Sequence, residues 1–272
     1  MSQWTIRSQF HDLNEIERGV RKGRNPYEGY VRGAGLQFGN VKDLCTSDPD
    51  FVQAYQLAQG RTLVDLYKLN NFYMLIRFFL PKLNPGAIAE FGSYKGGSCI
   101  FMAYLAKRFL NGAKVYGFDT FAGMPVTDRG VDLHKSGDFA DVNLPELRQY
   151  AAKLGLDNLI FVQGRFEETL PQVTQAMGPL AMLHIDCDIY SGVEYSYNNA
   201  KKLLVPGGYV VLDDPLAASC LGAFEAVEDH LIRADNLAAE QVFPHLVFRY
   251  PPLSSATVSP AAGTSSTIGY QA

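Results

Sequence analysis

The sequence has few of the residues that build disulfide-bonded or zinc-stabilised proteins. Only four cysteines occur among its 272 residues. They show neither CxxC spacing nor a histidine at ligand spacing, which argues against a zinc site and against a disulfide framework. We therefore expect Cys45, Cys99, Cys187 and Cys220 to be reduced and mostly buried thiols of a cytoplasmic protein.

A basic surplus and long apolar runs are also missing. Lys and Arg total 24 against 28 Asp and Glu, a formal net charge of -4, so no excess positive charge is available for a nucleic-acid backbone. The most apolar stretch, residues 72–80, is interrupted by Arg77 and falls far short of the roughly 20 residues that span a bilayer. The first ten residues also lack the apolar segment of a secretory signal. We expect neither a nucleic-acid nor a membrane partner.

The hydrophobic content, 47%, is sufficient for one large folded core. Residues 1–60 mix charge, glycine and aromatic residues without strong periodicity, and they indicate an irregular helical N-terminal extension. We expect this extension to serve substrate binding or assembly into a homo-oligomer. Residues 61–253 are predicted to form the main domain. Residues 254–272 are small, polar and uncharged, which predicts a flexible tail.

The main domain alternates short apolar strands with helices. This alternation predicts an α/β fold with a mostly parallel sheet and helices on both faces. Such sheets bind ligands at the carboxyl ends of their strands. The expected strands are residues 87–91, 114–119, 159–164, 180–186 and 209–214, with helices at 62–80, 98–110, 194–204 and 223–233, a turn at 206–208, and late strands in 241–252.

A glycine-rich turn follows the first predicted strand. Gly92 comes directly after the strand and Gly96 and Gly97 precede the helix, so backbone can approach a ligand closely. The spacing G-x-x-x-G-G differs from the G-x-G-x-x-G of dinucleotide sites and argues against NAD. Asp119 ends the second strand, where a carboxylate can accept hydrogen bonds from both ribose hydroxyls; a helix cap is its alternative role. The turn and this acid together indicate a nucleoside-containing ligand.

Two consecutive strands end in aspartates. Asp186 and Asp188 follow one apolar run, and Asp213 and Asp214 follow the next. Adjacent parallel strands would bring these ends together, and several carboxylates at one apolar-walled site repel one another unless a cation neutralises them. Oxygen ligands favour a hard ion such as magnesium, calcium or manganese. The alternative is a set of solvated turn aspartates and helix caps.

Seven blocks of the sequence carry a family resemblance: RTLVDLYKLNNF (61–72), EFGSYKGGSCIFM (90–102), YGFDTFAGMP (116–125), LHKSGDF (133–139), GRFEETLP (164–171), IDCDIYSG (185–192) and PGGYVVLDD (206–214). In these blocks the sequence resembles the macrocin O-methyltransferase family, which contains sugar O-methyltransferases of antibiotic tailoring pathways. The resemblance implies a class I methyltransferase (Rossmann-like) fold and S-adenosylmethionine as the methyl donor. It also implies magnesium, or another hard divalent cation, bound by Asp186, Asp213 and Asp214, with Asp186 as the general base.

The cofactor contacts are expected at the glycine-rich turn and at the ends of the next strands. Tyr94 and Phe121 are expected to pack near the sulfonium or the adenine, since an aromatic face favours positive charge; ordinary core packing is their alternative. Arg165 and Phe166 are expected to border the adenine, with a structural role as the alternative. The predicted cofactor-binding residues are Thr62, Glu90, Gly92, Ser93, Tyr94, Ser98, Asp119, Thr120, Phe121, Gly164, Arg165, Phe166 and Asp186.

The polar stretch at residues 124–143 is long for a connection and carries two glycines, which predicts an active-site lid. His134 within it is a candidate catalytic residue that would orient or deprotonate the acceptor; a solvated loop histidine is the alternative. His184 lies inside an apolar strand and is interpreted as a core histidine.

The predicted reaction is transfer of the methyl group of S-adenosylmethionine to a hydroxyl of a sugar or glycosylated small molecule. A bound metal would lower the pKa of that hydroxyl and Asp186 would remove its proton. Two alternatives remain: a catechol-type O-methyltransferase that acts on an aromatic diol, and a non-catalytic nucleoside-binding protein. Contacts to the acceptor would come from residues 1–60 and from the lid, where the spacing of residues does not predict which acceptor is bound.

Overall fold

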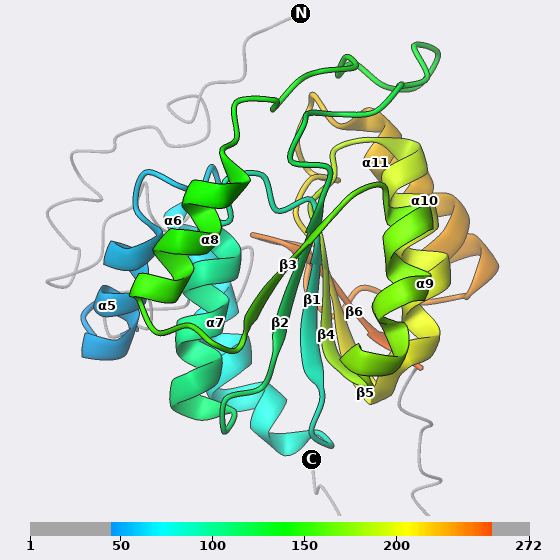
Figure 1. Cartoon of the computed structure of the whole chain (residues 1–272). Coiled ribbons are helices and arrows are strands. Elements are labelled where there is room, and N and C mark those ends of the chain that lie inside the picture. Colours follow the sequence, from blue (N-terminus) through cyan, green and yellow to red (C-terminus); the bar gives the residue numbers. More distant parts are fainter. Residues whose placement is uncertain (1–44, 252–272) are drawn as a thin grey trace, which may run out of the picture.

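A six-stranded sheet forms the centre of the molecule (Figure 1). The computed structural model describes residues 45–251. The strand order is β3-β2-β1-β4-β5-β6, with β6 antiparallel to β5 and every other pair parallel. This arrangement confirms the predicted α/β fold with a mostly parallel sheet. The strands are β1 Ala87–Phe91, β2 Val115–Asp119, β3 Leu159–Gln163, β4 Leu180–Ile185, β5 Leu204–Leu212 and β6 Leu246–Tyr250.

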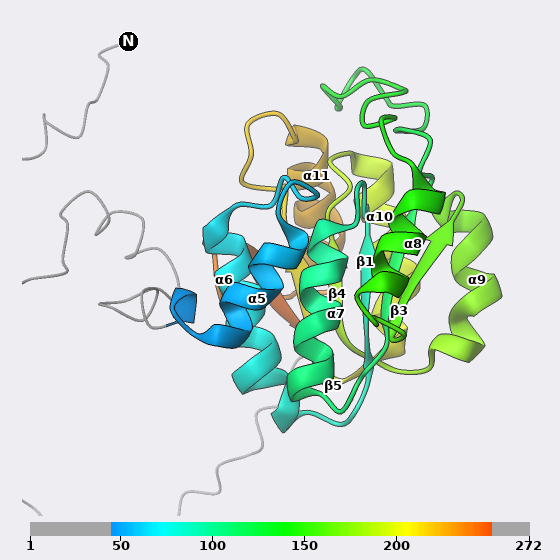
Figure 2. The same ribbon diagram turned by 60° about the vertical axis from the view of Figure 1, so that its left-hand side comes forward.

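Helices cover both faces of the sheet, as the two views in Figures 1 and 2 show. Three of them continue into short irregular helical turns, at residues 75–82, 201–203 and 227–234. One face carries α5 Pro49–Ala58, α6 Leu66–Met74, α7 Gly97–Phe109 and α8 Leu144–Lys153. The other carries α9 Phe166–Met177, α10 Tyr190–Ala200 and α11 Leu221–Ala226.

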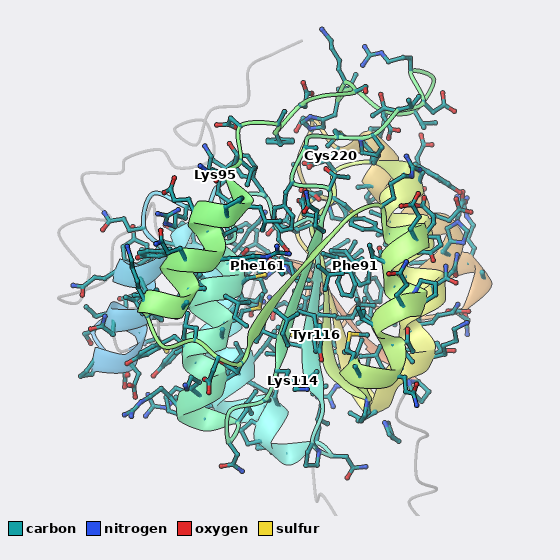
Figure 3. All side chains as sticks on the ribbon, viewed as in Figure 1. Phe91, Lys95, Lys114, Tyr116, Phe161 and Cys220 are labelled. Atoms are coloured by element: carbon teal, nitrogen blue, oxygen red, sulfur yellow. The ribbon has the colours of Figure 1, made fainter. Side chains whose placement is uncertain are left out.

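Each face of the sheet has its own apolar core, because side chains alternate between the two faces along a strand. In β1, Ile88 joins the core beneath α5 to α8, whereas Phe91 joins the core beneath α9 to α11. Phe91 stacks on Phe118 of β2 with ring centroids 4.6 Å apart. Figure 3 shows Phe91 and Tyr116 on one side of the sheet and Phe161 on the other. A sheet buried on both faces is held rigidly, which fixes the positions of its strand ends.

Several element boundaries differ from the sequence-based expectation. The helix expected at residues 62–80 begins only at Leu66, because the Asp65 carboxylate caps it by accepting a hydrogen bond from Lys68 N at 2.9 Å. The turn expected at residues 206–208 lies within β5, where a register shift opposite β4 accommodates the extra residues. The helix expected at 194–204 begins at Tyr190, and the late segment supplies one strand, β6.

The N-terminal extension is described only from residue 45, where α5 packs against α7. Its earlier residues and the predicted tail at 254–272 lie outside the described residues. Within residues 45–251, no helix is both long and apolar enough to cross a membrane. All four cysteines are free and buried.

Candidate active site

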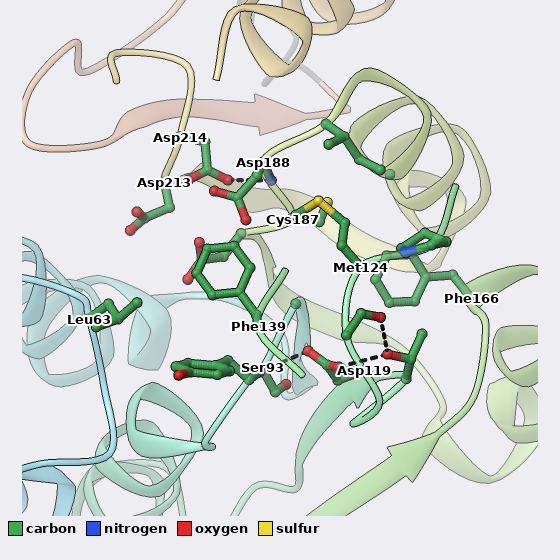
Figure 4. A pocket seen from close by; sticks show the side chains of 18 of the residues that line it. Leu63, Ser93, Asp119, Met124, Phe139, Phe166, Cys187, Asp188, Asp213 and Asp214 are labelled. Atoms are coloured by element: carbon green, nitrogen blue, oxygen red, sulfur yellow. Dashed lines mark hydrogen bonds between the residues drawn. The ribbon is translucent and has the colours of Figure 1, made fainter. Parts of the chain in front are cut away.

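A pocket opens at the carboxyl ends of β1, β2, β4 and β5. From β1 the chain continues through β2 to β3 at one edge of the sheet and then crosses to β4 on the other side of β1, so the pocket lies where the strand order reverses. Figure 4 shows Ser93 and Asp119 on one side of this pocket and Asp188, Asp213 and Asp214 on the other. Of the predicted site residues, those that line it are Thr62, Gly92, Ser93, Tyr94, Ser98, Asp119, Thr120, Arg165, Phe166, Asp186, Asp213 and Asp214.

The glycine-rich turn is shaped by contacts that only glycine allows. Gly92 has φ +92°, and a Cβ there would lie 1.6 Å from the carbonyl oxygen of Asp186. A Cβ on Gly97 would lie 2.5 Å from the carbonyl carbon of Arg61, and the Gly97 N–H donates to the Arg61 oxygen at 3.0 Å. The close approach at Gly97 is therefore to the segment that precedes α6. The turn joins the end of β1 to two other parts of the pocket wall.

Asp119 ties the end of β2 to this turn. Its carboxylate accepts hydrogen bonds from Tyr94 N at 2.8 Å and from Phe121 N at 2.7 Å. Burial raises the pKa of Asp119, and the two backbone hydrogen bonds oppose that shift. A carboxylate has about four acceptor positions, so two backbone donors leave capacity for further donors from the pocket. Asp119 closes the turn and does not cap a helix.

Three aspartates meet where β4 and β5 end side by side. One carboxylate oxygen each from Asp186, Asp213 and Asp214 lies within 4.8 Å of the others. Burial, reinforced by the neighbouring carboxylates, raises the pKa of both Asp186 and Asp214. Burial acts on Asp213 in the same direction, but contacts from His245 and Lys68 outweigh it and lower the pKa of Asp213. The parallel pairing of β4 and β5 confirms the expectation that these strand ends adjoin.

Two residues that the sequence analysis missed hold Asp213. Lys68, on α6, donates from Nζ to the Asp213 carbonyl oxygen at 3.0 Å and also to its carboxylate. His245, just before β6, places Nε2 3.1 Å from Asp213 Oδ1, and its Nδ1 lies 3.0 Å from Asn71 Nδ2. Lys68 lies in the block 61–72 and could have been found there. No sequence signal marked His245, which lies in the segment where only late strands were expected.

The donor set fits a hard divalent cation. The three aspartates supply only oxygen ligands; Asp213 and Asp214 are buried and Asp186 is half-buried. Asp188 adds a fourth carboxylate to the same pocket. The ammonium of Lys68 leaves this group net negative, so a divalent ion would relieve the remaining repulsion.

Four of the predicted site residues do not reach the pocket lining: Glu90, Phe121, Gly164 and His134. Glu90 is fully buried, with Oε1 3.0 Å from His184 Nδ1, and it accepts a hydrogen bond from Cys99. Glu90 on β1 and His184 on β4 are register partners, so their side chains share the face that points into the core. Glu90 therefore lies beneath the pocket. His184 is the core histidine that its strand predicted, fully buried.

Phe121 and Gly164 support the walls of the pocket from behind. Phe121 is buried and packs edge-on against Phe161 at 5.9 Å, the core role that was its alternative. The Gly164 N–H donates to the Asp119 carbonyl oxygen at 2.9 Å and so joins the ends of β2 and β3. Phe139 lines the pocket instead, 5.4 Å from Tyr94 ring to ring. It was not singled out in the sequence, although it ends the block 133–139.

His134 is not a solvated loop histidine. Its Nε2 lies 3.7 Å from Asp188 Oδ1 and 3.8 Å from the Cys220 sulfur, so it packs on the acidic side of the pocket from outside the lining. Asp188 itself turns into the pocket with φ +61°, and its N–H donates to Asp214 Oδ2 at 2.8 Å. Asp188 was expected only as one of the strand-end aspartates, without a role of its own.

Proteins named as O-methyltransferases are similar to this chain. The chain is 31% identical over 194 residues to the 8-demethyl-8-(2,3-dimethoxy-alpha-L-rhamnosyl)-tetracenomycin-C 4'-O-methyltransferase of Streptomyces olivaceus, over 68% of this chain and 72% of the relative. It is 28% identical over 182 residues to the Mycinamicin III 3''-O-methyltransferase of Micromonospora griseorubida, over 62% and 71% of the two chains.

A solved structure and a family model point to the same class of enzyme as these relatives. The calicheamicin methyltransferase CalS11 has the same fold, with a TM-score of 0.60 and 20% sequence identity over 88% of this chain and 97% of the other. The family model for Macrocin-O-methyltransferase (TylF) matches residues 53–239. The chain therefore belongs to the macrocin O-methyltransferase family, and it is an S-adenosylmethionine-dependent O-methyltransferase.

Proposed function

We propose that this enzyme methylates a hydroxyl of a sugar-containing small molecule, with a divalent cation, magnesium by preference, held by Asp186, Asp213 and Asp214. The observation that carries the proposal is that one pocket brings together the glycine-rich turn with Asp119 and the cluster of aspartates. A methyl donor and a metal-held hydroxyl would meet there within one enclosure. Family membership excludes the non-catalytic alternative.

The sugar acceptor is supported by the names of the relatives. One is named for methylation at the 4' position of a rhamnosyl tetracenomycin, and another for the 3'' position of mycinamicin III. The first name contains a rhamnosyl group, which is a sugar, and the primed position in each name denotes an appended ring. They favour the sugar proposal over the catechol alternative.

The donor side of the pocket would bind and orient S-adenosylmethionine. We propose that Asp119 accepts hydrogen bonds from the ribose hydroxyls and that the turn from Gly92 to Ser98 follows the rest of the donor. Phe166 and Arg165 line the pocket beyond β3, where they would border the adenine. When bound, S-adenosylmethionine supplies an electrophilic methyl group on a sulfonium. The role of these residues is to hold it in line with the acceptor oxygen.

The acceptor side would hold the hydroxyl and take its proton. Asp186, which the resemblance implies as the base, also belongs to the three-aspartate set, and a carboxylate that neutralises a cation is a weaker base. Asp188 lies outside that set and lines the same pocket. Burial raises the pKa of Asp188 as it does that of Asp186, so the choice between them rests on the place of Asp188 outside the three-aspartate set. We therefore assign proton removal to Asp188 and metal binding to Asp186, with His134 supporting Asp188 from behind.

The experiment that tests this proposal compares Asp213→Asn with the wild type. The substitution removes one ligand charge with almost no change in size, so S-adenosylhomocysteine should still bind in calorimetry. Magnesium binding should weaken, and turnover of a glycoside acceptor with methyl-labelled donor should fall roughly 100-fold or more. Asp157→Asn is the matched control, because Asp157 is exposed and pairs with Lys107 away from the pocket.

Removing the metal with a chelator tests metal dependence, and substituting Asp188 tests proton removal. A chelator should abolish wild-type turnover, and added magnesium should restore it. Asp188→Asn should lose turnover by roughly 100-fold while it keeps magnesium affinity. Full wild-type turnover in chelator, together with wild-type behaviour of Asp213→Asn, would show that the aspartates are structural. Methylation of catechols but of no glycoside in the same assay would replace the sugar acceptor by the aromatic one.

A further inference from the structure

One residue of the lid is buried although its neighbours are exposed. Within residues 124–143, Asp132 alone is buried, with 3% of its surface exposed, while Val126 and Leu133 are 83% and 59% exposed. Carboxylates are seldom fully buried unless they are paired or hydrogen-bonded. Asp132 should therefore have polar partners where it contacts the rest of the protein.

Asp132 fastens the lid to the start of α10. Its Oδ1 accepts a hydrogen bond from Tyr190 N at 2.9 Å, and Tyr190 is the first residue of that helix. A carboxylate at a helix N-terminus satisfies a free N–H and favours the helix dipole. Its Oδ2 accepts from Asp128 N at 3.2 Å, and the Asp132 N–H donates to the Asp128 carbonyl oxygen at 2.7 Å. These bonds fold the lid into a tight turn that presents Asp132 inward.

A glycine on α11 makes room for this contact. A Cβ on Gly222 would lie 2.0 Å from Asp132 Oδ1 and 3.1 Å from Tyr190 N. No other residue could occupy position 222 while Asp132 stays where it is. The lid, the start of α10 and the start of α11 thus meet at one point, which we call the latch: Asp132, Tyr190 N and Gly222.

The latch lies beside the acidic side of the pocket. Tyr190 follows Asp188 by two residues, and His134 follows Asp132 by two residues. With the latch made, His134 packs on Asp188, and Phe139 of the same lid lines the pocket. We propose that Asp132 is a positioning residue for methyl transfer: it holds the lid down so that His134 stays against Asp188 and Phe139 closes the acceptor site. This inference rests on the proposed function for the acceptor site and for the role of Asp188 as the base.

The test measures the lid in the full-length protein by hydrogen exchange with S-adenosylhomocysteine bound. Asp132→Ala removes the acceptor of the Tyr190 N–H, and Gly222→Ala displaces the carboxylate, so either should speed exchange in residues 124–143 about tenfold. Exchange in β4 and in the turn from Gly92 to Ser98 should not change. Asp132→Asn keeps a side-chain oxygen that can accept from Tyr190 N, and it should fall between Asp132→Ala and the wild type. Ser136→Ala, at an exposed lid position outside the turn of residues 128–132, is the control.

A double variant shows whether the two positions act through one contact. If they do, Asp132→Ala combined with Gly222→Ala should match the Asp132→Ala single variant, because no carboxylate remains to be displaced. Independent effects would multiply to about a hundredfold. With a glycoside acceptor, Asp132→Ala should raise KM or lower kcat about tenfold and leave the affinity for S-adenosylhomocysteine unchanged.

Unchanged exchange in residues 124–143 of Asp132→Ala, or multiplied effects in the double variant, would overturn the latch. The exchange measurement needs neither metal nor acceptor, so it remains decisive even if no glycoside is methylated. In that case the proposed acceptor would be wrong and the latch would still stand or fall by itself. If Gly222→Ala does not fold, the comparison of Asp132→Ala with Asp132→Asn still decides the question.

Discussion

The two sides of the pocket are built in different ways. The donor side is a short backbone turn after β1, closed by Asp119, whose carboxylate accepts two backbone N–H groups. The acceptor side gathers side chains from several distant elements, including Lys68 on α6, His245 before β6 and His134 on the lid. The donor side holds its shape by local geometry, whereas the acceptor side must balance buried negative charge. Substitutions on the two sides should therefore have different signatures.

The two sides meet at a close backbone contact between Gly92 and Asp186, and disrupting it gives the largest expected effect. A Cβ on Gly92 would lie 1.6 Å from the Asp186 carbonyl oxygen, and backbone atoms cannot move aside as a flexible side chain can. Gly92→Ala should lower the free energy of unfolding by about 3 kcal/mol and abolish both S-adenosylhomocysteine and magnesium binding. Denaturant unfolding and calorimetry measure these losses.

A second glycine distinguishes the cost of steric overlap from the cost of backbone strain at a positive φ. Gly112 also has a positive φ, +73°, but a Cβ there would meet nothing within 4 Å. Gly112→Ala should therefore cost only about 1 kcal/mol and leave both ligands bound. If Gly92→Ala bound either ligand as the wild type does, the two sides would not be joined through this contact.

The next effect should be confined to the donor side. Asp119→Ala removes the acceptor of two backbone N–H groups and the proposed partner of the ribose, so the affinity for S-adenosylhomocysteine should fall about 100-fold. Magnesium affinity should stay the same, which is the reverse of the pattern expected for Asp213→Asn. Calorimetry of both ligands with both variants gives the crossed comparison. A loss of magnesium binding in Asp119→Ala would mean that the two sides are not separable.

The donor side was predictable from the sequence because its parts are close together in the chain. The turn, the strand before it and the strand that ends at Asp119 follow one another within about thirty residues, and their spacing carries the geometry. The mostly parallel sheet followed from the alternation of strands and helices, and the meeting of Asp186 with Asp213 and Asp214 followed from adjacent strands. The sequence did not show that Glu90 would lie outside the pocket lining, because only the strand register reveals that its side chain points into the core.

The rest of the acceptor side could not be read from the sequence. Lys68 and His245 approach Asp213 from elements 145 and 32 residues away, and only the packing of α6 and the entry to β6 bring them there. The latch likewise depends on Asp132 meeting Tyr190 N and on the space left at Gly222. Such contacts have no spacing rule, since they result from how whole elements pack.

A smaller effect should come from removing the ammonium group of Lys68, which lies on the acceptor side. Lys68 donates to the Asp213 carboxylate and so competes with a metal for that ligand. Lys68→Met keeps the length of the side chain and removes its charge. Magnesium should bind about tenfold more tightly to this variant, and the metal-free protein should melt at a lower temperature. Lys107→Met, at an exposed pair with Asp157, is the control. Weaker magnesium binding would instead mean that Lys68 orients Asp213 for the metal.

The smallest expected effect is a difference in pH dependence between the two sides. Burial raises the pKa of Asp119 in the free protein, so Asp119 holds its proton to a higher pH than an exposed aspartate does. Hydrogen bonds from ribose hydroxyls favour the ionised form. Affinity for S-adenosylhomocysteine should therefore be full well above that raised pKa and should fall as the pH drops through it, by at most tenfold per pH unit.

Magnesium affinity should depend on pH more steeply, because two carboxylates on the acceptor side, those of Asp186 and Asp214, have pKa values raised well above the usual range by burial and by their neighbours. Both must lose protons when the ion binds, so up to two protons are released, against one on the donor side. Calorimetry of each ligand from pH 8 down to pH 5 should show magnesium affinity falling first and faster. Asp119→Asn should flatten only the S-adenosylhomocysteine profile. Parallel profiles for the two ligands would mean that the carboxylates titrate as one group, and that the division between a geometric donor side and a charged acceptor side is wrong.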